Sequence, residues 1–389
     1  MYKIECQKKF SFEMDTMPFE ERCPRLFTEG KKKVAYFKNE FDNSTFRYRC
    51  INFCQAMEDS DEFVVTYFLC KEIPRILEYI DNIDIVILQR ATWTPDVENL
   101  IFVAKRKNIP VVYDMDDLFF NASYGISYIG HIGRNYTESD VREFFGWTVG
   151  YEYAAKNCDA FIATVSPLKE ALEQYFNKPA FVVPNFLNNN QIKESEYVVK
   201  NREYSDERFR IGYFSGSHSH LMDFKSIQDE LIDLLRKYPY MDIVIVGFFE
   251  LEGDLKVLQN MGRVIFRKFV PYQELQYEIG MVDVNVVPLT IDTFNEAKSE
   301  LKFFEAGIVK VPSCVAPTKL YKQIVKDGVN GFVCEDGEWF EKIEKLYLDK
   351  QLRKDIAEAA YKTACDIYLP ERQTQAITDT YNSILNLKK

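Results

Sequence analysis

Histidine is scarce in this chain, and positive charge is in deficit. The 389 residues include three histidines, and the net charge is −11. Nucleic-acid binding needs a basic stripe that offsets phosphate repulsion, so this balance argues against a nucleic-acid partner. No window reaches the roughly 18–20 apolar residues of a membrane span, and the first residues lack the charged-then-apolar pattern of a signal peptide.

Paired metal-binding and redox motifs are also missing. The nine cysteines contain no C-x-x-C pair and are scattered through apolar segments, which predicts reduced, buried thiols in the cytoplasm. His218 and His220 flank Ser219 without a third ligand at useful spacing, so no metal site is expected. No G-x-G-x-x-G turn opens either half of the chain, which argues against a dehydrogenase. These patterns still allow a cytoplasmic protein that acts at the inner face of a membrane.

Short apolar runs alternate with helical patterns along most of the chain. Runs that are apolar on both faces and are separated by helices indicate buried parallel sheets. The 31 phenylalanines and 24 tyrosines supply a large core. The predicted strands are 33–37, 63–68, 85–88, 111–113, 160–163, 181–183, 209–214, 242–247, 264–266, 282–287, 311–316 and 331–334.

The pattern divides the chain into two α/β halves of similar length. A polar stretch without a clear period, 191–207, interrupts it and predicts an interdomain linker. The fold class is therefore α/β, with two Rossmann-like domains facing a cleft. The expected parts are an irregular extension (1–30), a first domain (31–190), the linker, a second domain (208–366) and an amphipathic C-terminal helix (367–389).

The segment from Lys298 to Glu305 carries the clearest chemistry. It follows an apolar strand and is expected to form a helix with Lys298 and Lys302 one turn apart. A helix start with two cations suits a diphosphate. Glu305, two turns on, is placed to accept hydrogen bonds from both hydroxyls of a ribose. The alternative is an ordinary amphipathic helix with solvated lysines.

Two other strand ends supply candidate donor contacts. After 209–214, Gly216 would let the backbone approach a phosphate and Ser217 would donate to it, with His218 beside them. The alternative there is a capped turn with a packed His220. After 264–266, Lys268 and Phe269 come at the expected cleft edge, and Phe269 or its neighbours are expected to contact the base.

The first domain offers acidic residues at the corresponding edge. Asp116 and Asp117 follow the strand at 111–113, where they would bind acceptor hydroxyls or act as a base. A divalent metal and a solvated helix start are the alternatives. Arg49 and Arg90 are candidates for holding an anionic acceptor or closing the cleft, and structural ion pairing is the alternative for both.

The segment Lys298-Ser299-Glu300-Leu301-Lys302-Phe303-Phe304-Glu305 resembles the donor-binding segment of GT-B glycosyltransferases of the family 4 type. The resemblance is strongest to bacterial polysaccharide and O-antigen enzymes that read K-S-x-L-K-x-x-E. Their G-[ST]-x-x-H-x-x-D-F and Y-D-x-D-D patterns have counterparts at 216–224 and 113–117. The wider family has an earlier glutamate, which falls on Ala297 here; Glu296 is one place off.

The resemblance implies a retaining transfer of a hexosyl group from a nucleotide-diphosphate sugar to a glycan or lipid-linked glycan. The pathway would be the synthesis of a bacterial surface polysaccharide or glycoconjugate. It also implies that Glu305 holds the ribose, that neither cofactor nor metal takes part, and that the C-terminal helix crosses back onto the first domain. A GT-B-fold sugar-nucleotide epimerase and a non-catalytic nucleotide-sugar-binding subunit are the alternatives.

Overall fold

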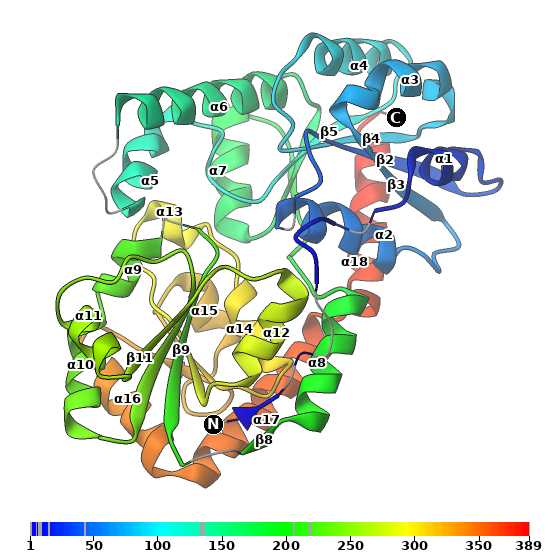
Figure 1. Ribbon diagram of the computed structural model, residues 1–389. Coiled ribbons are helices and arrows are strands. Elements are labelled where there is room, and N and C mark those ends of the chain that lie inside the picture. Colours follow the sequence, from blue (N-terminus) through cyan, green and yellow to red (C-terminus); the bar gives the residue numbers. More distant parts are fainter. Residues whose placement is uncertain are drawn as a thin grey trace.

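Two α/β lobes lie side by side and are joined along one edge by long helices (Figure 1). The computed structural model describes residues 2–4, 6, 10–14, 16–42, 44–132, 137–204, 207–217 and 220–388. No helix among these residues has the length and apolar character needed to cross a membrane.

The first lobe is built on a six-stranded, wholly parallel sheet in the order β3-β2-β4-β5-β6-β7. Its strands are β2 (Lys32–Lys38), β3 (Phe63–Leu69), β4 (Ile85–Gln89), β5 (Val111–Met115), β6 (Ala160–Ala163) and β7 (Ala180–Val182). Its helical segments are α1 (Phe19–Arg22), η1 (Cys23–Phe27), η2 (Arg47–Ile51), α2 (Asn52–Ala56), η3 (Cys70–Glu72), α3 (Ile73–Ile76), η4 (Leu77–Asn82), α4 (Pro95–Arg106), η5 (Ala122–Tyr124), α5 (Gly125–Ile132), α6 (Glu138–Lys156) and α7 (Ser166–Phe176).

The second lobe repeats this plan with a parallel sheet in the order β11-β10-β9-β12-β13-β14. Its strands are β9 (Phe209–Ser215), β10 (Met241–Gly247), β11 (Val264–Arg267), β12 (Val284–Val287), β13 (Ser313–Val315) and β14 (Phe332–Val333). Its helices are α9 (Leu221–Lys225), α10 (Gln228–Lys237), α11 (Gly253–Asn260), α12 (Tyr272–Gly280), α13 (Thr293–Glu296), α14 (Leu301–Gly307), α15 (Lys319–Ile324), α16 (Trp339–Leu348) and α17 (Lys350–Ile367).

The predicted fold class is confirmed, and each of the twelve predicted strands overlaps an observed one. The physical reason is visible in the central strands. All seven residues of β9 and all seven of β10 are buried, because helices cover both faces of the sheet. Such strands carry continuous apolar runs, and these are easily recognised in the sequence.

The predicted linker at 191–207 is helical over most of its length. Helix α8 (Asn189–Asn201) occupies it, and the Asn188 side chain caps its first turn in a reciprocal pair with Gln191. The buried face of α8 includes Gln191, Glu194 and Ser195. Glu194 accepts a hydrogen bond of 2.6 Å from Tyr277 in α12. Because this face is polar, the sequence shows no apolar period there.

The start of the chain is more ordered than an irregular extension. Tyr2–Lys3 (β1) pairs antiparallel with Glu203–Tyr204 (β8), and α1 and η1 precede the first sheet. The buried side chain of Arg22 anchors this region: its guanidinium makes two 2.9 Å bonds to Glu72 and one of 2.7 Å to the carbonyl of Tyr67.

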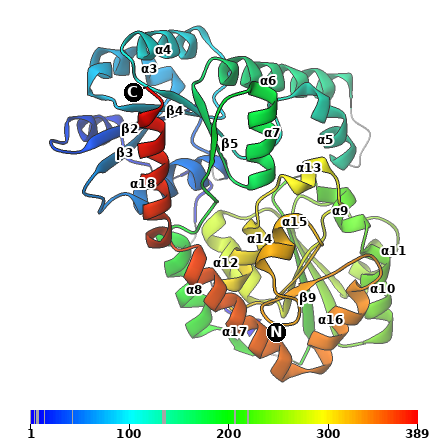
Figure 2. The same cartoon turned by 180° about the vertical axis from the view of Figure 1, so that it is seen from behind.

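The last helix, α18 (Pro370–Asn386), runs along the first domain although it follows the second in sequence (Figure 2). The hydroxyls of Tyr381 and Tyr36 are 3.0 Å apart in the buried core, and the Thr374 hydroxyl donates to the carbonyl of Ala56 at 2.8 Å. Helix α17, immediately before it, packs on α14 in the second domain. These two helices therefore tie the lobes together.

The hydroxyl pair predicts a specific stability pattern. Tyr381→Phe leaves the buried Tyr36 hydroxyl without its partner, so we expect a loss of about 1–3 kcal/mol in the free energy of unfolding. The double variant Tyr36→Phe/Tyr381→Phe should lose less than this. Urea unfolding followed by circular dichroism measures both, with the exposed Tyr240→Phe as control. A single variant as stable as wild type would contradict the assignment.

Candidate functional site

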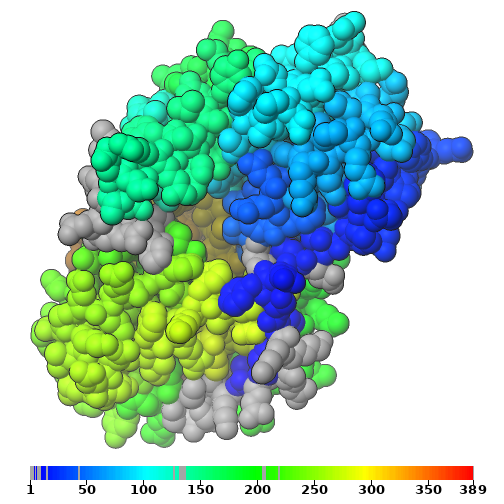
Figure 3. Space-filling model, turned by 45° about the horizontal axis from the view of Figure 1, so that its top comes forward, coloured from blue at the N-terminus to red at the C-terminus, as the bar shows by residue number. Residues whose placement is uncertain are grey.

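A pocket of about 490 Å³ lies between the two domains. Figure 3 looks toward the hollow between the lobes. The pocket is lined at the carboxyl ends of strands from both sheets, which is where open α/β sheets bind ligands. Its lining residues are Ser44, Thr45, Arg47, Tyr48, Asp116, Asn185, Phe214, Ser215, Gly216, His220, Val246, Gly247, Phe269, Val270, Tyr272, Leu275, Leu301, Lys302 and Glu305.

Two buried ammonium groups mark the second-domain side of the cleft. The Nζ atoms of Lys298 and Lys302 are buried, and neither has a hydrogen-bond partner in the described part of the chain. Burial lowers the pKa of Lys302 to about 8 and also lowers the pKa of Lys298. Unpaired buried charge is costly, so this arrangement favours an anionic ligand.

The predicted helix from Lys298 begins later than expected. Helix α14 starts at Leu301, so Lys298 and Ser299 lie in the turn after α13. Lys302 and Leu301 line the pocket, whereas Lys298 and Ser299 lie outside its lining. The Ser299 hydroxyl accepts a 3.0 Å hydrogen bond from Asn185 of the first domain. Glu300, the residue before α14, is buried, and its carboxylate accepts a 2.7 Å bond from Tyr368.

Glu305 lines the pocket and is held from the opposite side by the first domain. Tyr48 donates its hydroxyl hydrogen to Oε1 of Glu305, and the amide of Gln191 donates to the same atom at 3.3 Å. The nearest guanidinium nitrogen of Arg47 is 3.8 Å from it. Burial raises the pKa of Glu305, and Arg47 acts in the opposite direction. Within the described part of the chain, these contacts all involve Oε1 and none involves Oε2.

The turn after β9 brings a histidine into the site that the sequence had suggested only as a packed residue. Gly216 and His220 line the pocket, while the carbonyl of Ser217 accepts a 2.8 Å bond from Ser215. His218, the predicted contact, lies outside the described residues. The spacing G-S-x-x-H that starts at Gly216 points to His220, so the signal was present in the sequence.

The surroundings of His220 keep its ring neutral. Its Nδ1 is 2.9 Å from Asp223. Burial is the largest cause that holds the pKa of His220 well below its ordinary value, and the charges of Lys298 and Lys302 add to it. The Asp223 carboxylate also accepts bonds from Thr290 and from Asn295 at 2.9 Å, which fixes the turn against α13.

The acidic pair of the first domain lies at the cleft, and its two carboxylates have different surroundings. Asp116 lines the pocket and is 3.2 Å from Arg90. Burial raises the pKa of Asp117 to about 6, while the charge of Lys298 is the largest cause that lowers it. Lys298 belongs to the other domain, so Asp117 interacts electrostatically across the cleft. Arg90 acts as an ion-pair partner, with its guanidinium over the ring of Phe119.

Arg49 does not reach the cleft surface, which corrects its placement on the acceptor side. Its side chain is fully buried and makes two 2.9 Å bonds to Asp114, which is also fully buried. A third bond of 2.8 Å reaches the carbonyl of Val183. The pair joins η2 to the end of β5 and to the residue after β7, so Arg49 has a structural role.

Lys268 and Phe269, the two predicted donor contacts after β11, differ in their position relative to the pocket. Phe269 lines the pocket with its ring 40% exposed. It is stacked 5.8 Å from Phe12 and lies 5.0 Å from Phe248. Lys268 is exposed and is absent from the pocket lining, which corrects its prediction as a donor contact. Consecutive residues of an extended segment point in opposite directions, which accounts for the difference.

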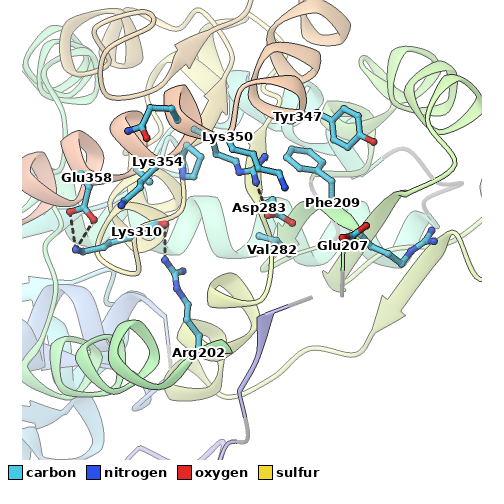
Figure 4. A pocket seen from close by; sticks show the side chains of 15 residues that line it. Arg202, Glu207, Phe209, Val282, Asp283, Lys310, Tyr347, Lys350, Lys354 and Glu358 are labelled. Atoms are coloured by element: carbon cyan, nitrogen blue, oxygen red, sulfur yellow. Dashed lines mark hydrogen bonds and ion pairs between the residues drawn. The ribbon is translucent and has the colours of Figure 1, made fainter. Parts of the chain in front are cut away.

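A second cavity, of about 780 Å³, lies at the opposite edge of the second sheet. It is lined by residues at the amino ends of β9 and β12 and by the first turns of α17, and Lys310 and Glu358 form an ion pair in its wall (Figure 4). Strand amino ends are the edge away from the usual ligand site. The interdomain pocket is therefore the better candidate, although it is smaller.

Among the described residues, no group of three or more His, Cys, Asp or Glu side chains is placed to hold a metal ion. Asp114 is committed to Arg49 and Asp116 to Arg90, so the acidic cluster at the end of β5 is already divided between two guanidinium groups.

Residues 222–363 match the family model of the glycosyl transferases group 1. No curated protein matches the chain. The matched region covers much of the second domain and includes both lysines and Glu305.

Solved structures with the same fold span nearly the whole chain. HepE from Anabaena, in complex with UDP and glucose, is 16% identical with a TM-score of 0.55, over 90% of this chain and 100% of that one. A glycosyltransferase from Rickettsia africae is 13% identical with a TM-score of 0.61, over 91% and 99%. Sucrose-phosphate synthase from Thermosynechococcus elongatus is 11% identical with a TM-score of 0.59, over 92% and 100%. The fold is therefore GT-B.

The raised pKa of Asp117 predicts how stability depends on pH. In the unfolded chain the carboxyl ionises near pH 4, whereas in the folded protein it stays protonated until about pH 6. As pH rises from about 4 to about 6, wild type therefore loses up to about 3 kcal/mol of unfolding free energy that Asp117→Asn retains. Urea unfolding at pH 4.5 and 7.5 should show the variant to be more stable than wild type by a clearly larger margin at the higher pH.

Asp116→Asn provides the matched control, because it removes the partner of Arg90 and should destabilise the protein at pH 7.5. Equal effects of the two substitutions at both pH values would contradict the assigned environment of Asp117.

Proposed function

We propose that this protein is a retaining glycosyltransferase that moves a hexosyl group from a nucleotide-diphosphate sugar to a glycan or lipid-linked glycan. One observation carries the proposal: the buried Nζ atom of Lys302 lacks a hydrogen-bond partner among the described residues in a pocket that also presents the carboxylate of Glu305, and the same holds for Nζ of Lys298 outside the pocket lining. Cations beside a hydroxyl-binding carboxylate match the diphosphate and ribose of such a donor.

The two lysines act on the leaving group. Breaking the bond between sugar and diphosphate builds negative charge on the departing phosphate, and preorganised cations in a water-poor site stabilise that charge. Oε2 of Glu305 accepts from the ribose hydroxyls, and Phe269 contacts the base. Gly216 allows the phosphates to approach the backbone, and neutral His220 is available to hydrogen-bond the transferred sugar.

The first domain binds the acceptor and receives the proton of its hydroxyl. Asp116 faces the pocket, and Asp117 lies beyond it toward Lys298. A carboxyl with a pKa of about 6 is suited to exchange a proton with an acceptor hydroxyl near neutral pH. We propose that Asp116 orients that hydroxyl and Asp117 receives its proton. No cofactor or metal takes part in this scheme, since lysines occupy the position where a cation would offset the diphosphate.

The comparisons and the chemistry of the site suggest which substrates to test first. HepE is described with UDP and glucose bound, so UDP-glucose is the first donor to test. We propose an acceptor from bacterial surface polysaccharide or glycoconjugate synthesis and a cytoplasmic location at the inner face of the membrane.

The decisive experiment is a thermal-shift panel of nucleoside diphosphates and nucleotide sugars, followed by turnover of the best binder with EDTA present and absent. A ligand that binds the folded protein raises its melting temperature by mass action. We expect a diphosphate donor to stabilise the protein and transfer to survive EDTA. No stabilisation by any member would refute the function, and activity restored by magnesium would refute the metal-free scheme.

Lys302→Met tests the role of the ammonium group. A hydrogen bond to a charged group contributes about 1.5–3 kcal/mol, so affinity for UDP should fall roughly 10- to 100-fold while affinity for uridine changes little. Isothermal titration calorimetry measures both ligands. Lys268→Met is the matched control, because Lys268 is adjacent to the base contact yet absent from the pocket lining. Equal losses for UDP and uridine would remove Lys302 from the phosphate site.

A further inference from the structure

His220 lines the interdomain pocket, and one of its two ring nitrogens is committed to a buried carboxylate. Its Nδ1 lies 2.9 Å from Oδ2 of Asp223, and the two side chains are 15% and 0% exposed. Within the described part of the chain the ring has no second hydrogen-bond partner, and Nε2 is not among the buried nitrogen atoms that lack one. Nε2 is therefore the ring nitrogen that a ligand in the pocket can reach.

The charges around this pair decide which nitrogen carries the proton. Burial opposes ionisation of Asp223, but the hydrogen bond from His220 and the charge of Lys298 lower the pKa of Asp223 below its ordinary range. An ionised carboxylate only accepts hydrogen bonds, so Nδ1 must be the donor. The ring is neutral, because burial and the charges of Lys298 and Lys302 lower the pKa of His220. A neutral imidazole has a single N–H, so Nε2 carries a lone pair and accepts hydrogen bonds.

The other oxygen of Asp223 fixes the orientation of the carboxylate. Oδ1 accepts from the backbone N–H of Thr290 at 3.0 Å, from its hydroxyl at 3.1 Å and from the side-chain amide of Asn295 at 2.9 Å. If an amide replaced this carboxylate, its oxygen would have to face these donors, because its nitrogen would otherwise meet two N–H groups. Its NH2 group would then face His220, and a donor there requires Nδ1 to lose its proton to Nε2.

We propose that Asp223 is a positioning residue that holds His220 in the tautomer whose Nε2 accepts a hydrogen bond from a hydroxyl of the sugar carried by the donor. The inference rests on the proposed function and adds the role of Asp223 and the direction of that hydrogen bond. A sugar hydroxyl can donate to a lone pair, whereas an ionised phosphate oxygen only accepts. His220 therefore favours the sugar over the diphosphate at its place in the pocket.

The first test observes the tautomer directly, by long-range ¹H–¹⁵N correlation spectra at pH 7 of protein labelled with ¹⁵N-histidine. The chain has three histidines, so His220→Gln identifies the ring by the signals that it removes. We expect the proton of His220 on Nδ1 in wild type and on Nε2 in Asp223→Asn. A wild-type ring protonated on Nε2, or an unchanged tautomer in folded Asp223→Asn, would overturn the inference. The wild-type spectrum can do so even if the variant does not fold.

The second test compares UDP-glucose with UDP by isothermal titration calorimetry on wild type and Asp223→Asn. The ratio of the two affinities is the quantity to compare, because loss of the Asp223 charge changes the surroundings of Lys298 and Lys302 for both diphosphates alike. We expect the ratio to fall roughly 3- to 10-fold in the variant, which is the contribution of about one hydrogen bond. An unchanged ratio would overturn the contact with the sugar. Wild type that binds neither ligand would instead refute the proposed function, while the spectra would still report the tautomer.

Thr290→Val is the matched control for both tests. It removes one hydroxyl donor to Oδ1 of Asp223 but keeps the carboxylate, the backbone N–H of residue 290 and the amide of Asn295. We expect a lower melting temperature, with the tautomer of His220 and the affinity ratio as in wild type. A tautomer that changes in Thr290→Val as well would show that a loosened turn is sufficient, and it would remove Asp223 from the assigned role.

Discussion

Positive charge buried without a hydrogen-bonded counterpart is the constraint around which the cleft is arranged. Taking an ammonium group out of water costs several kcal/mol unless other charges offset it. Lys298 and Lys302 are offset at longer range by Asp223, and Lys298 also by Asp117. Burial lowers the pKa of His220, and the charges of the two lysines lower it further, so its ring stays neutral. An arriving anion relieves this cost, so ligand affinity and protein stability are linked through the same two atoms.

This electrostatic arrangement depends on two domains that hold each other at several points. Asn185 bonds to Ser299 across the boundary, and Tyr48 bonds to Glu305. Phe119 packs against Phe294 with ring centres 5.8 Å apart. Asn185, Tyr48 and Glu305 also line the pocket, so the first two contacts are made by residues of the pocket wall. Since each contact joins residues distant in sequence, the environment of the lysines is a property of the assembled pair of domains.

The strands and the pocket-lining positions of Lys302 and Glu305 could be predicted from sequence because their signals are local. Continuous apolar runs identify buried strands, and the spacing of Lys298, Lys302 and Glu305 is a short motif. Helix α8 was missed because its buried face carries Gln191, Glu194 and Ser195, whose partners lie in other elements. Arg47 and Arg49 are two residues apart in one sequence segment, and sequence alone could not tell that Arg49 is in the core and Arg47 in the pocket. That difference arises from a π-helical turn and from the position of Asp114, neither of which has a local signature.

The path of the last helix has a consequence for synthesis of the protein on the ribosome. The core of the first domain includes Tyr381 and Ile384 of α18, and Lys388 forms an ion pair with Asp159 of that domain at 3.0 Å. Translation delivers these residues only after the whole second domain. The nascent first domain therefore lacks part of its apolar core while the second domain is being made, so its folding cannot be completed independently of the synthesis of the second domain.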